Sequence, residues 1–224
     1  MLATLRPALS LLIAVALLAP ASFAFDIPLS DEAIREAYFL GQRRDEKTAQ
    51  FFEKYNRRLS PPESGPYISD IAFFTPYANA VELSRQNSLG YSAQDALQAY
   101  KKHGDIVSVV ITIVFTANYG ALLEKPINSR SGSTHGYQLR SANFWRDFSY
   151  RLFQHDELIE PLDISGQATY AGNGDSSGSS DLSGAVITLT YDAAKISSAA
   201  DADVVVDTIA DHQLVTTFDL AALR

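Results

Sequence analysis

The spacing of hydrophobic and polar positions along this chain changes from about 3.6 to 2 after Gly104. Between residues 31 and 58, apolar side chains recur at spacings of three and four, a pattern that predicts helix. After Gly104 the spacing falls to two, and residues 107–115 alternate between two sets that are both largely apolar. A strand of this kind is typical of the centre of a sheet that is covered on both faces. We therefore expect a mainly β protein with some helix.

The helical pattern of residues 31–58 is expected to contain one break. Ser30 and Asp31 suit its first turn, because their side-chain oxygens accept hydrogen bonds from backbone N–H groups that have no helical partner. Gly41 then weakens any continuous helix. The segment is predicted to form either one kinked helix or two helices that meet between Gly41 and Asp45.

A further helix is predicted over residues 92–103. Ser92 and Asp95 have the spacing of a capping box, in which each side chain accepts a hydrogen bond from the backbone of the other residue. Gly104 suits the left-handed conformation that ends many helices. Residues 77–86 fit a short helix or an extended segment, and the pattern does not decide between them.

The strands expected elsewhere are mostly short and regularly spaced. A second long strand is predicted at residues 144–153, and shorter strands are predicted at 67–74, 163–170, 185–191, 204–208 and 213–219. Clusters of Gly, Pro, Asn or Asp separate most of them. This spacing predicts an antiparallel β-sandwich, immunoglobulin-like or C2-like in type, preceded by an N-terminal helical segment.

The first residues of the chain have the layout of a secretory signal peptide. Arg6 supplies a positive start, residues 9–19 are almost entirely apolar, and small side chains precede a cleavage point after Ala24. The apolar run is shorter than the roughly 20 residues that a helix needs to span a bilayer. We expect export to the periplasm or out of the cell, with no transmembrane span left after cleavage.

These patterns divide the chain into four expected parts. Residues 1–24 form the signal peptide, and residues 25–60 form the N-terminal helical segment. Residues 61–66 form a proline-rich linker, which suits neither a helix nor a central strand. Residues 67–224 form the β-sandwich domain, with the helix at 92–103 inserted between its early strands.

Composition removes several classes of function. The chain has no cysteine, which excludes zinc–thiolate centres, iron–sulfur clusters and a thiol nucleophile. Its formal net charge is −8 at pH 7, which disfavours nucleic acid and anionic membranes as partners. The densest basic groups lie at predicted helix ends, where cations complement the helix dipole, and they are Arg43-Arg44, Arg57-Arg58 and Lys101-Lys102.

One stretch matches a pattern of nucleophilic hydrolases. Residues 174–178 read Gly-x-Ser-x-Gly, with Ser176 as the candidate nucleophile. That chemistry needs a histidine and an acid within hydrogen-bond reach, and its serine turn leads into a helix, whereas here a loop and a strand follow. The four histidines, at positions 103, 135, 155 and 212, lack the close spacing of a metal pair. The pattern is therefore better explained by chance in a Gly/Ser-rich loop, and we predict no catalytic residue, metal ligand or cofactor.

The acids of two other segments have a plain and a functional interpretation. Asp156 and Glu157 follow His155 where a strand must turn, and polar residues are ordinary in such a turn. Asp175 and Asp181 lie in the polar loop at residues 172–181, where they could bind calcium with acids of another loop. Calcium takes six to eight oxygen ligands, so these two acids alone are too few. A solvated loop is the favoured interpretation.

Aromatic residues could also bind a ligand. Trp145 and Tyr150 carry flat faces with polar edges, which suit stacking on sugar rings. The alternative is that Trp145 belongs to the core of the sandwich, and we favour this second interpretation.

Several short segments resemble a group of uncharacterised exported bacterial proteins. The resemblance begins at residues 25–30 (Phe-Asp-Ile-Pro-Leu-Ser) and continues through residues 36–43. It recurs at Thr75-Pro76-Tyr77 and at residues 218–220, so it would span most of the chain that follows the signal peptide. The resemblance implies no activity, cofactor or catalytic residue.

The leading hypothesis from the sequence is an exported, non-enzymatic module of the periplasm or envelope that binds a protein or a cell-surface component. Export, the sandwich pattern and the lack of a convergent catalytic set in the sequence favour it. One alternative is an exported hydrolase of a polymer, acting through Ser176 or through Asp156 and Glu157. A second alternative is calcium-dependent adhesion through the 172–181 loop. The sequence leaves the ligand and the oligomeric state open.

Overall fold

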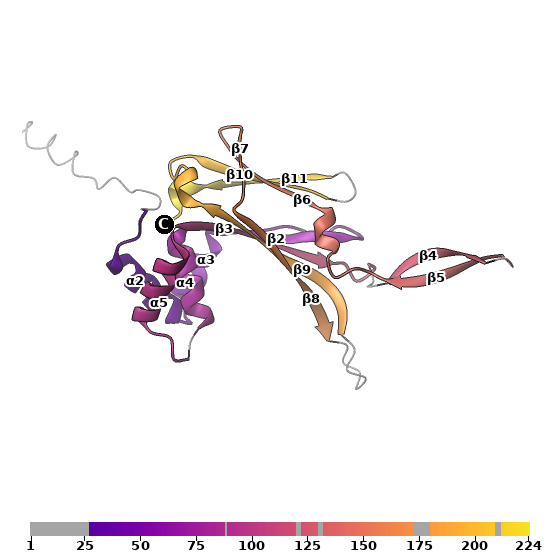
Figure 1. Cartoon of the computed structure of the whole chain (residues 1–224), viewed down its shortest axis with the longest axis horizontal. Helices are drawn as coiled ribbons and strands as arrows, with labels where there is room; N and C mark the ends of the chain where they lie inside the picture. The colour runs from indigo at the N-terminus through magenta and orange to yellow at the C-terminus, as the bar shows by residue number, and fades with distance from the viewer. Residues whose placement is uncertain (1–26, 88, 120–121, 130–131, 173–179, 209–211) are drawn as a thin grey trace, which may run out of the picture.

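The protein is mainly β, with two antiparallel sheets, a separate hairpin and a group of helices (Figure 1). The computed structural model describes residues 27–87, 89–119, 122–129, 132–172, 180–208 and 212–224. Its α-helices are α2 (Asp31–Gln42), α3 (Glu46–Glu53), α4 (Pro76–Gln86) and α5 (Ala93–His103). They lie together at one end of the larger sheet (Figure 1).

Each of these helices begins at a residue whose side chain caps it. The four N-caps are Ser30, Asp45, Thr75 and Ser92, and each accepts a hydrogen bond from a backbone N–H in the first turn. The capping box between Ser92 and Asp95 is complete, and Gly104 ends α5 with a positive φ of 76°. The predicted helix at 92–103 is confirmed to within one residue.

The two helices before β1 meet inside the expected window. Helix α2 ends at Gln42, and α3 begins at Glu46 after its cap Asp45. The expected continuation of helix to residue 58 is wrong, because β1 (Asn56–Arg58) pairs with β2 (Pro66–Phe74). Residues 77–86, left undecided by their pattern, lie in α4, where Pro76 occupies the first turn.

The larger sheet has five strands in the order β1-β2-β3-β9-β8, all antiparallel. Its other members are β3 (Ile106–Phe115), β8 (Asp163–Gly172) and β9 (Ser180–Asp192). The predicted strand at 107–115 is therefore confirmed and lies at the centre. The smaller sheet has the order β11-β10-β6-β7, with β6 (Ser149–Gln154), β7 (Glu157–Ile159), β10 (Asp201–Asp207) and β11 (Gln213–Asp219).

One apolar core takes residues from both sheets. Residues 107, 109, 111 and 113 of β3 are fully buried in it, together with Leu152 of β6 and Phe218 of β11. The 3₁₀ turn at Phe144–Asp147 adds Phe144 and Trp145. Burial of this much apolar surface is the main driving force for folding.

The predicted strand at 144–153 begins too early. Residues 144–147 form a 3₁₀ turn, and only the part from Ser149 to Gln154 is β6. Phe144 and Trp145 are neighbours in sequence and both are buried, which a strand with one buried face does not allow. The first part of the stretch that suggested a strand is therefore a turn, in which two consecutive aromatic rings pack into the core.

The outer face of the larger sheet is covered by helices over one end. The side chains of Val110, Thr112 and Val114 on β3 point to this face and are half-buried. Helix α4 is tied to the sheet where the Asn79 amide donates to the Ile106 carbonyl at 3.0 Å. The expectation that β3 is covered on both faces is thus wrong for much of its outer face, because the helices reach only part of it.

The last residue of the chain joins the helices to the sheets. The Tyr55 hydroxyl donates to the Arg224 carbonyl at 2.9 Å and accepts from the Arg224 backbone N–H at 3.0 Å. The Arg224 side chain forms an ion pair with Glu36 on α2 and lies over the Tyr77 ring at 4.4 Å. Burial raises the pKa of Tyr55 to about 12, which keeps this hydroxyl protonated in the folded state.

A two-stranded hairpin projects from the rest of the molecule (Figure 1). It consists of β4 (Leu122–Ser129) and β5 (Gly132–Leu139), which pair only with each other. The sequence pattern predicted no strand in this stretch. Within the described residues, no helix combines the length and the apolar character that a membrane span requires.

Candidate functional site

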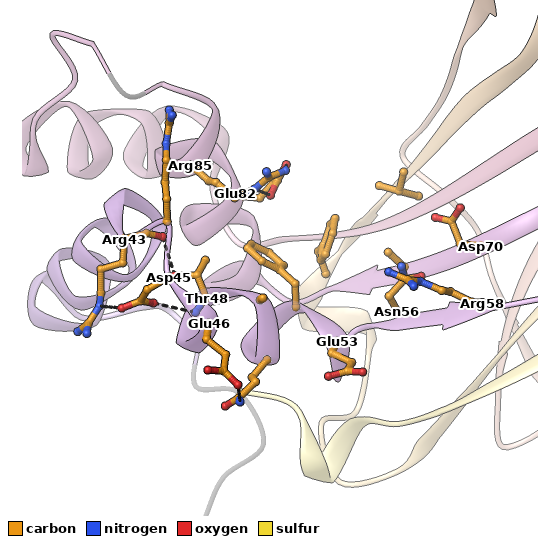
Figure 2. Close-up of a pocket in the computed structure, with 17 residues that line it drawn as sticks. Arg43, Asp45, Glu46, Thr48, Glu53, Asn56, Arg58, Asp70, Glu82 and Arg85 are labelled. Carbon is orange, nitrogen blue, oxygen red and sulfur yellow. Dashed lines mark hydrogen bonds and ion pairs between the residues drawn. The ribbon is translucent and has the colours of Figure 1, made fainter.

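A large hollow lies between α3, α4 and the outer face of strands β1 to β3 (Figure 2). We call it the cleft. Its volume is about 1260 Å³, and charged side chains from the helices and from the sheet line its walls. These charged residues are Arg43, Arg44, Asp45, Glu46, Glu53, Arg58, Asp70, Glu82 and Arg85. The lining of the cleft therefore presents charges of both signs.

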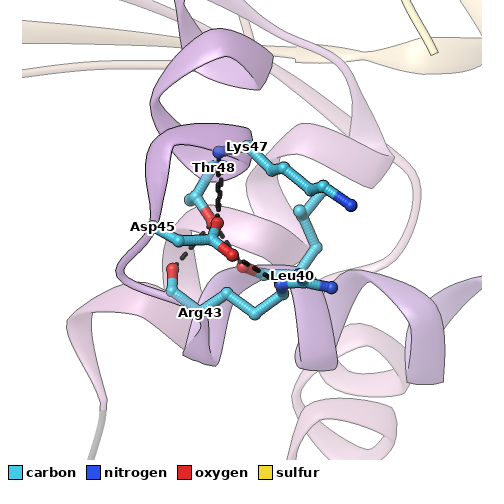
Figure 3. Close-up of polar contacts among 5 residues, drawn as sticks. All are labelled: Leu40, Arg43, Asp45, Lys47 and Thr48. Carbon is cyan, nitrogen blue, oxygen red and sulfur yellow. Dashed lines mark hydrogen bonds and ion pairs between the residues drawn. The ribbon is translucent and has the colours of Figure 1, made fainter.

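The corner between α2 and α3 forms one rim of the cleft (Figure 3). The Asp45 carboxylate accepts from the backbone N–H groups of Lys47 at 3.1 Å and Thr48 at 3.3 Å, and it pairs with the Arg43 side chain at 3.0 Å. The hydrogen bond from Arg43 lowers the pKa of Asp45, and the backbone donors act in the same direction. The carboxylate is thus charged at neutral pH and fixes the start of α3.

The Thr48 hydroxyl closes the same corner from inside. Its oxygen lies 2.7 Å from the Arg43 carbonyl and 2.9 Å from the Leu40 carbonyl, and the Leu40 carbonyl also accepts from the Arg43 backbone N–H at 3.2 Å. The residue is buried, with 4% of its surface exposed. The hydroxyl therefore ties the start of α3 to the backbone where α2 ends.

Helix α4 provides the opposite wall. The Arg85 guanidinium donates two hydrogen bonds of 2.7 Å to the two oxygens of Glu82, and this pairing raises the pKa of Arg85. The guanidinium also lies 5.6 Å from the centre of the Phe52 ring, which is on α3. The wall is thus a preformed charged pair that touches an aromatic ring.

The floor of the cleft comes from the sheet. Asp70 on β2 accepts from the hydroxyls of Ser69 at 2.7 Å and Thr112 at 3.1 Å. It stands opposite Arg58 in the register of β1 and β2, so that opposite charges face each other across the strands. The side-chain oxygen of Asn56 is buried in the described part of the structure and has no hydrogen-bond partner there.

A second, smaller hollow lies on the other side of α4. It has a volume of about 420 Å³ and is lined mainly by apolar residues of α4, α5 and the sheet. It shares Phe74, Glu82 and Val110 with the cleft, so the two hollows adjoin beneath α4. At its edge the Tyr100 hydroxyl accepts from the Leu29 N–H at 2.7 Å and donates to Asp105. Burial, followed by the bond to Asp105, raises the pKa of Tyr100 to about 12.

The acids and histidine of the 155–157 stretch lie far from these hollows in the fold. His155 and Asp156 form the turn between β6 and β7, with φ values of 52° and 62°. Two consecutive positive φ angles belong to a tight hairpin turn. All three side chains are exposed, and no partner among the described residues converges on them. The structure thus places them in a turn of the backbone.

The polar loop at 172–181 falls largely outside the described residues, and Asp175 and Ser176 with it. Asp181 is described and exposed at the start of β9. Among the described residues, no three acidic or histidine side chains gather as a metal site would require. The structure therefore leaves the calcium and hydrolase alternatives without an assembled site in its described part.

The two aromatic candidates are involved in packing. Trp145 is 5% exposed, and its ring lies directly against Gly166 of β8, where an added Cβ would come within 2.6 Å of the ring. Its burial leaves no face for a sugar to stack on. The Tyr150 hydroxyl donates to the Trp145 carbonyl at 2.7 Å, and burial raises the pKa of Tyr150 well above its ordinary value. Tyr150 thereby holds the turn that contains Trp145.

The basic pairs of the sequence are one partial signal of the cleft. Arg43 does lie at the end of α2, and Lys101 and Lys102 lie in the last turn of α5, as expected. The expectation for Arg57 and Arg58 is wrong, because both belong to β1, where Arg58 lines the floor of the cleft. The cleft joins residues from 43 to 110, and no short motif links them.

Comparison with models of known protein families gives no match, and comparison with curated proteins gives no match either. What the cleft binds must therefore be inferred from its own chemistry.

Proposed function

We propose that the chain is an exported, non-enzymatic module of the periplasm or envelope that binds another protein, and that a polypeptide segment of that partner lies in the cleft. Export is inferred from the signal-peptide pattern of residues 1–24. The observation that carries the binding proposal is the cleft itself, a large hollow with charges of both signs above an aromatic base.

The size of the cleft favours a polymer over a small molecule. Pockets for small molecules measure roughly 300–1,000 Å³, whereas the cleft measures about 1260 Å³ and is open to solvent. Its charges favour a polypeptide over a polyanion, because Glu46, Glu53 and Asp70 would repel a uniformly acidic chain. A polypeptide carries charges of both signs, apolar side chains and regular N–H donors.

The base of the cleft offers contacts for such a segment. Phe52 and Phe74 meet edge to face with ring centres 5.8 Å apart, and both line the cleft. Aromatic residues are enriched where protein partners bind most tightly.

We also propose that the two sheets form a β-sandwich of immunoglobulin-like or C2-like type. The shared core of the two sheets and their antiparallel pairing support this assignment. In this arrangement the helices and the cleft lie on the outer face of one sheet, away from the sandwich core.

The proposal is tested by reversing one charge in the cleft. The purified protein is used to isolate a partner from envelope extract, and its affinity for that partner is then measured for the Arg58→Glu variant. We expect Arg58→Glu to weaken binding about tenfold, equal to about 1.4 kcal/mol, because it places two acids opposite each other on the floor.

Arg35→Glu provides the matched control. Arg35 is exposed on α2 and does not line the cleft. The control is expected to bind like the wild type. Equal loss of binding in both variants, or no loss in Arg58→Glu, contradicts the proposed site, and the failure of repeated isolations to return any partner contradicts the proposed function.

A further inference from the structure

Strand β8 ends the larger sheet, and no described strand pairs with its outer edge. It is ten residues long, whereas the edge strands β1 and β7 have three residues each. Proteins protect long edges with lysine, proline or bulges, because free backbone groups invite pairing with another chain. Strand β8 contains no basic residue and no proline, and its one charge is Asp163 at the first position. The register between β8 and β9 shifts between Thr169 and Tyr170, where the extra residue, Ser183, lies on β9, so β8 itself carries no inserted residue.

Two large apolar side chains of β8 are exposed to solvent. They are among nine such side chains in the described residues. Ile164 is 44% exposed and Tyr170 is 55% exposed. They pair with Leu189 and Leu182 of β9, so both stand on the core-facing side of the sheet. Figure 1 shows β8 and β9 extending past the smaller sheet at the end where β8 finishes and β9 begins.

We propose that β8 pairs antiparallel with β8 of a second copy of this chain, about a two-fold axis at Gln167. Antiparallel pairing of identical strands is self-complementary, as a two-fold interface requires. With Gln167 opposite Gln167, Ile164 of each copy stands opposite Tyr170 of the other. Aromatic and β-branched side chains form favourable cross-strand pairs, so the two exposed apolar residues cover each other.

The rest of the register is compatible with this axis. Ser165 stands opposite Thr169 on the outer face, and Asp163 stands opposite Ala171, so no like charges meet. A slip of one residue would place core-side residues opposite outer-side residues. A slip of two residues would place Ile164 opposite Ala168 or Gly172 and would leave the apolar pair unmade. Of these registers, only the one centred on Gln167 pairs Ile164 of each copy with Tyr170 of the other.

The dimer would join two five-stranded sheets into one continuous sheet. The cleft lies at β1 to β3, on the opposite edge of the sheet from β8. Both clefts of a dimer thus stay open. The dimer does not depend on what the cleft binds, and its test leaves the binding proposal untouched.

Charge placed on the proposed axis tests the dimer. Gln167 is exposed, so substitutions there do not disturb the core. In the Gln167→Lys variant two positive charges face each other across the axis, and in Gln167→Glu two negative charges do. We expect the wild type to sediment as a dimer, each variant to sediment as a monomer, and an equal mixture of the two variants to regain the dimer.

Val215→Lys is the matched control, because Val215 is exposed on β11, an edge strand of the other sheet. It is expected to remain dimeric. A monomeric wild type, a dimeric Gln167→Lys variant, or a dimer lost in Val215→Lys overturns the proposal. A mixture that stays monomeric overturns the axis at Gln167. Circular dichroism of each variant, matching the wild type, confirms that the change is one of association.

Discussion

At the scale of single residues, Gly41 decides how closely two helices of the cleft can approach. A Cβ at this position would overlap the Val81 carbonyl oxygen and would lie 2.7 Å from the Cβ of Ser84, both on α4. The neighbouring Gln42 amide donates to the Ser84 carbonyl at 2.6 Å and depends on the same close approach. Because α4 also holds Glu82 and Arg85, Gly41 controls where one wall of the cleft stands.

The Gly41→Ala substitution is therefore expected to destabilise the protein. Overpacking of this kind costs about 1–3 kcal/mol, and the higher helix propensity of alanine offsets roughly 1 kcal/mol of that cost. We expect a net loss of about 1–2 kcal/mol in the free energy of unfolding, measured by urea denaturation. Arg35→Ala, on the exposed side of the same helix, should change it by less than about 0.5 kcal/mol. An equal or greater stability of Gly41→Ala would show that α2 and α4 are not in close contact.

At the scale of elements, caps and alternation explain what the sequence could predict. Helix α5 was predictable because Ser92, Asp95 and Gly104 specify its two ends through local contacts. Strand β3 was predictable because its alternating apolar residues meet both a buried core and a half-buried outer face. In each element, the information lies within the segment itself.

The errors arise where distant contacts decide the local structure. Residues 56–58 continue a helical pattern, yet they form β1 because β2, eight residues further on, offers them backbone partners. Residues 144–147 alternate like a strand, yet they turn because the core accepts two consecutive aromatic rings. The cleft could not be predicted for the same reason, since it depends on how α3 and α4 dock on the sheet.

The corner between α2 and α3 makes the stability depend on pH through Asp45. Its pKa in the folded state is lowered from the ordinary value of 3.8, chiefly by the hydrogen bond from Arg43. A lowered pKa contributes stability that is present above the ordinary value and is lost as the pH falls below it. Asp45→Asn keeps a capping side chain and removes only the charge.

We expect the melting temperature of Asp45→Asn to be lower than that of the wild type at neutral pH. The difference should disappear as the pH falls below about 4, because the wild-type carboxylate then takes up a proton. Melting temperatures of both proteins between pH 7 and pH 2 check this. The same comparison in an Arg43→Ala background should give a smaller difference at neutral pH. A difference that does not change with pH would mean that the charge of Asp45 contributes nothing.

At the scale of the whole molecule, the two edges of the larger sheet have different roles in this account. The cleft lies near one edge, at β1, and its charges are held by pairs such as Glu82 with Arg85. The other edge, at β8, is free and is proposed to join two copies. A dimer built in this way presents two clefts, and a partner with two binding segments would gain affinity from both.

The central claim, that the cleft is the binding surface, is tested most directly by cross-linking from inside it. Because the chain has no cysteine, a single cysteine can carry a photoactivated cross-linker to one chosen position. Gln50→Cys places it on α3 in the lining of the cleft, and Glu32→Cys places it on the exposed side of α2. In envelope extract, we predict that the probe at position 50 is joined to one protein that the probe at position 32 does not capture. Identical capture from both positions, or capture from position 32 alone, would contradict the account.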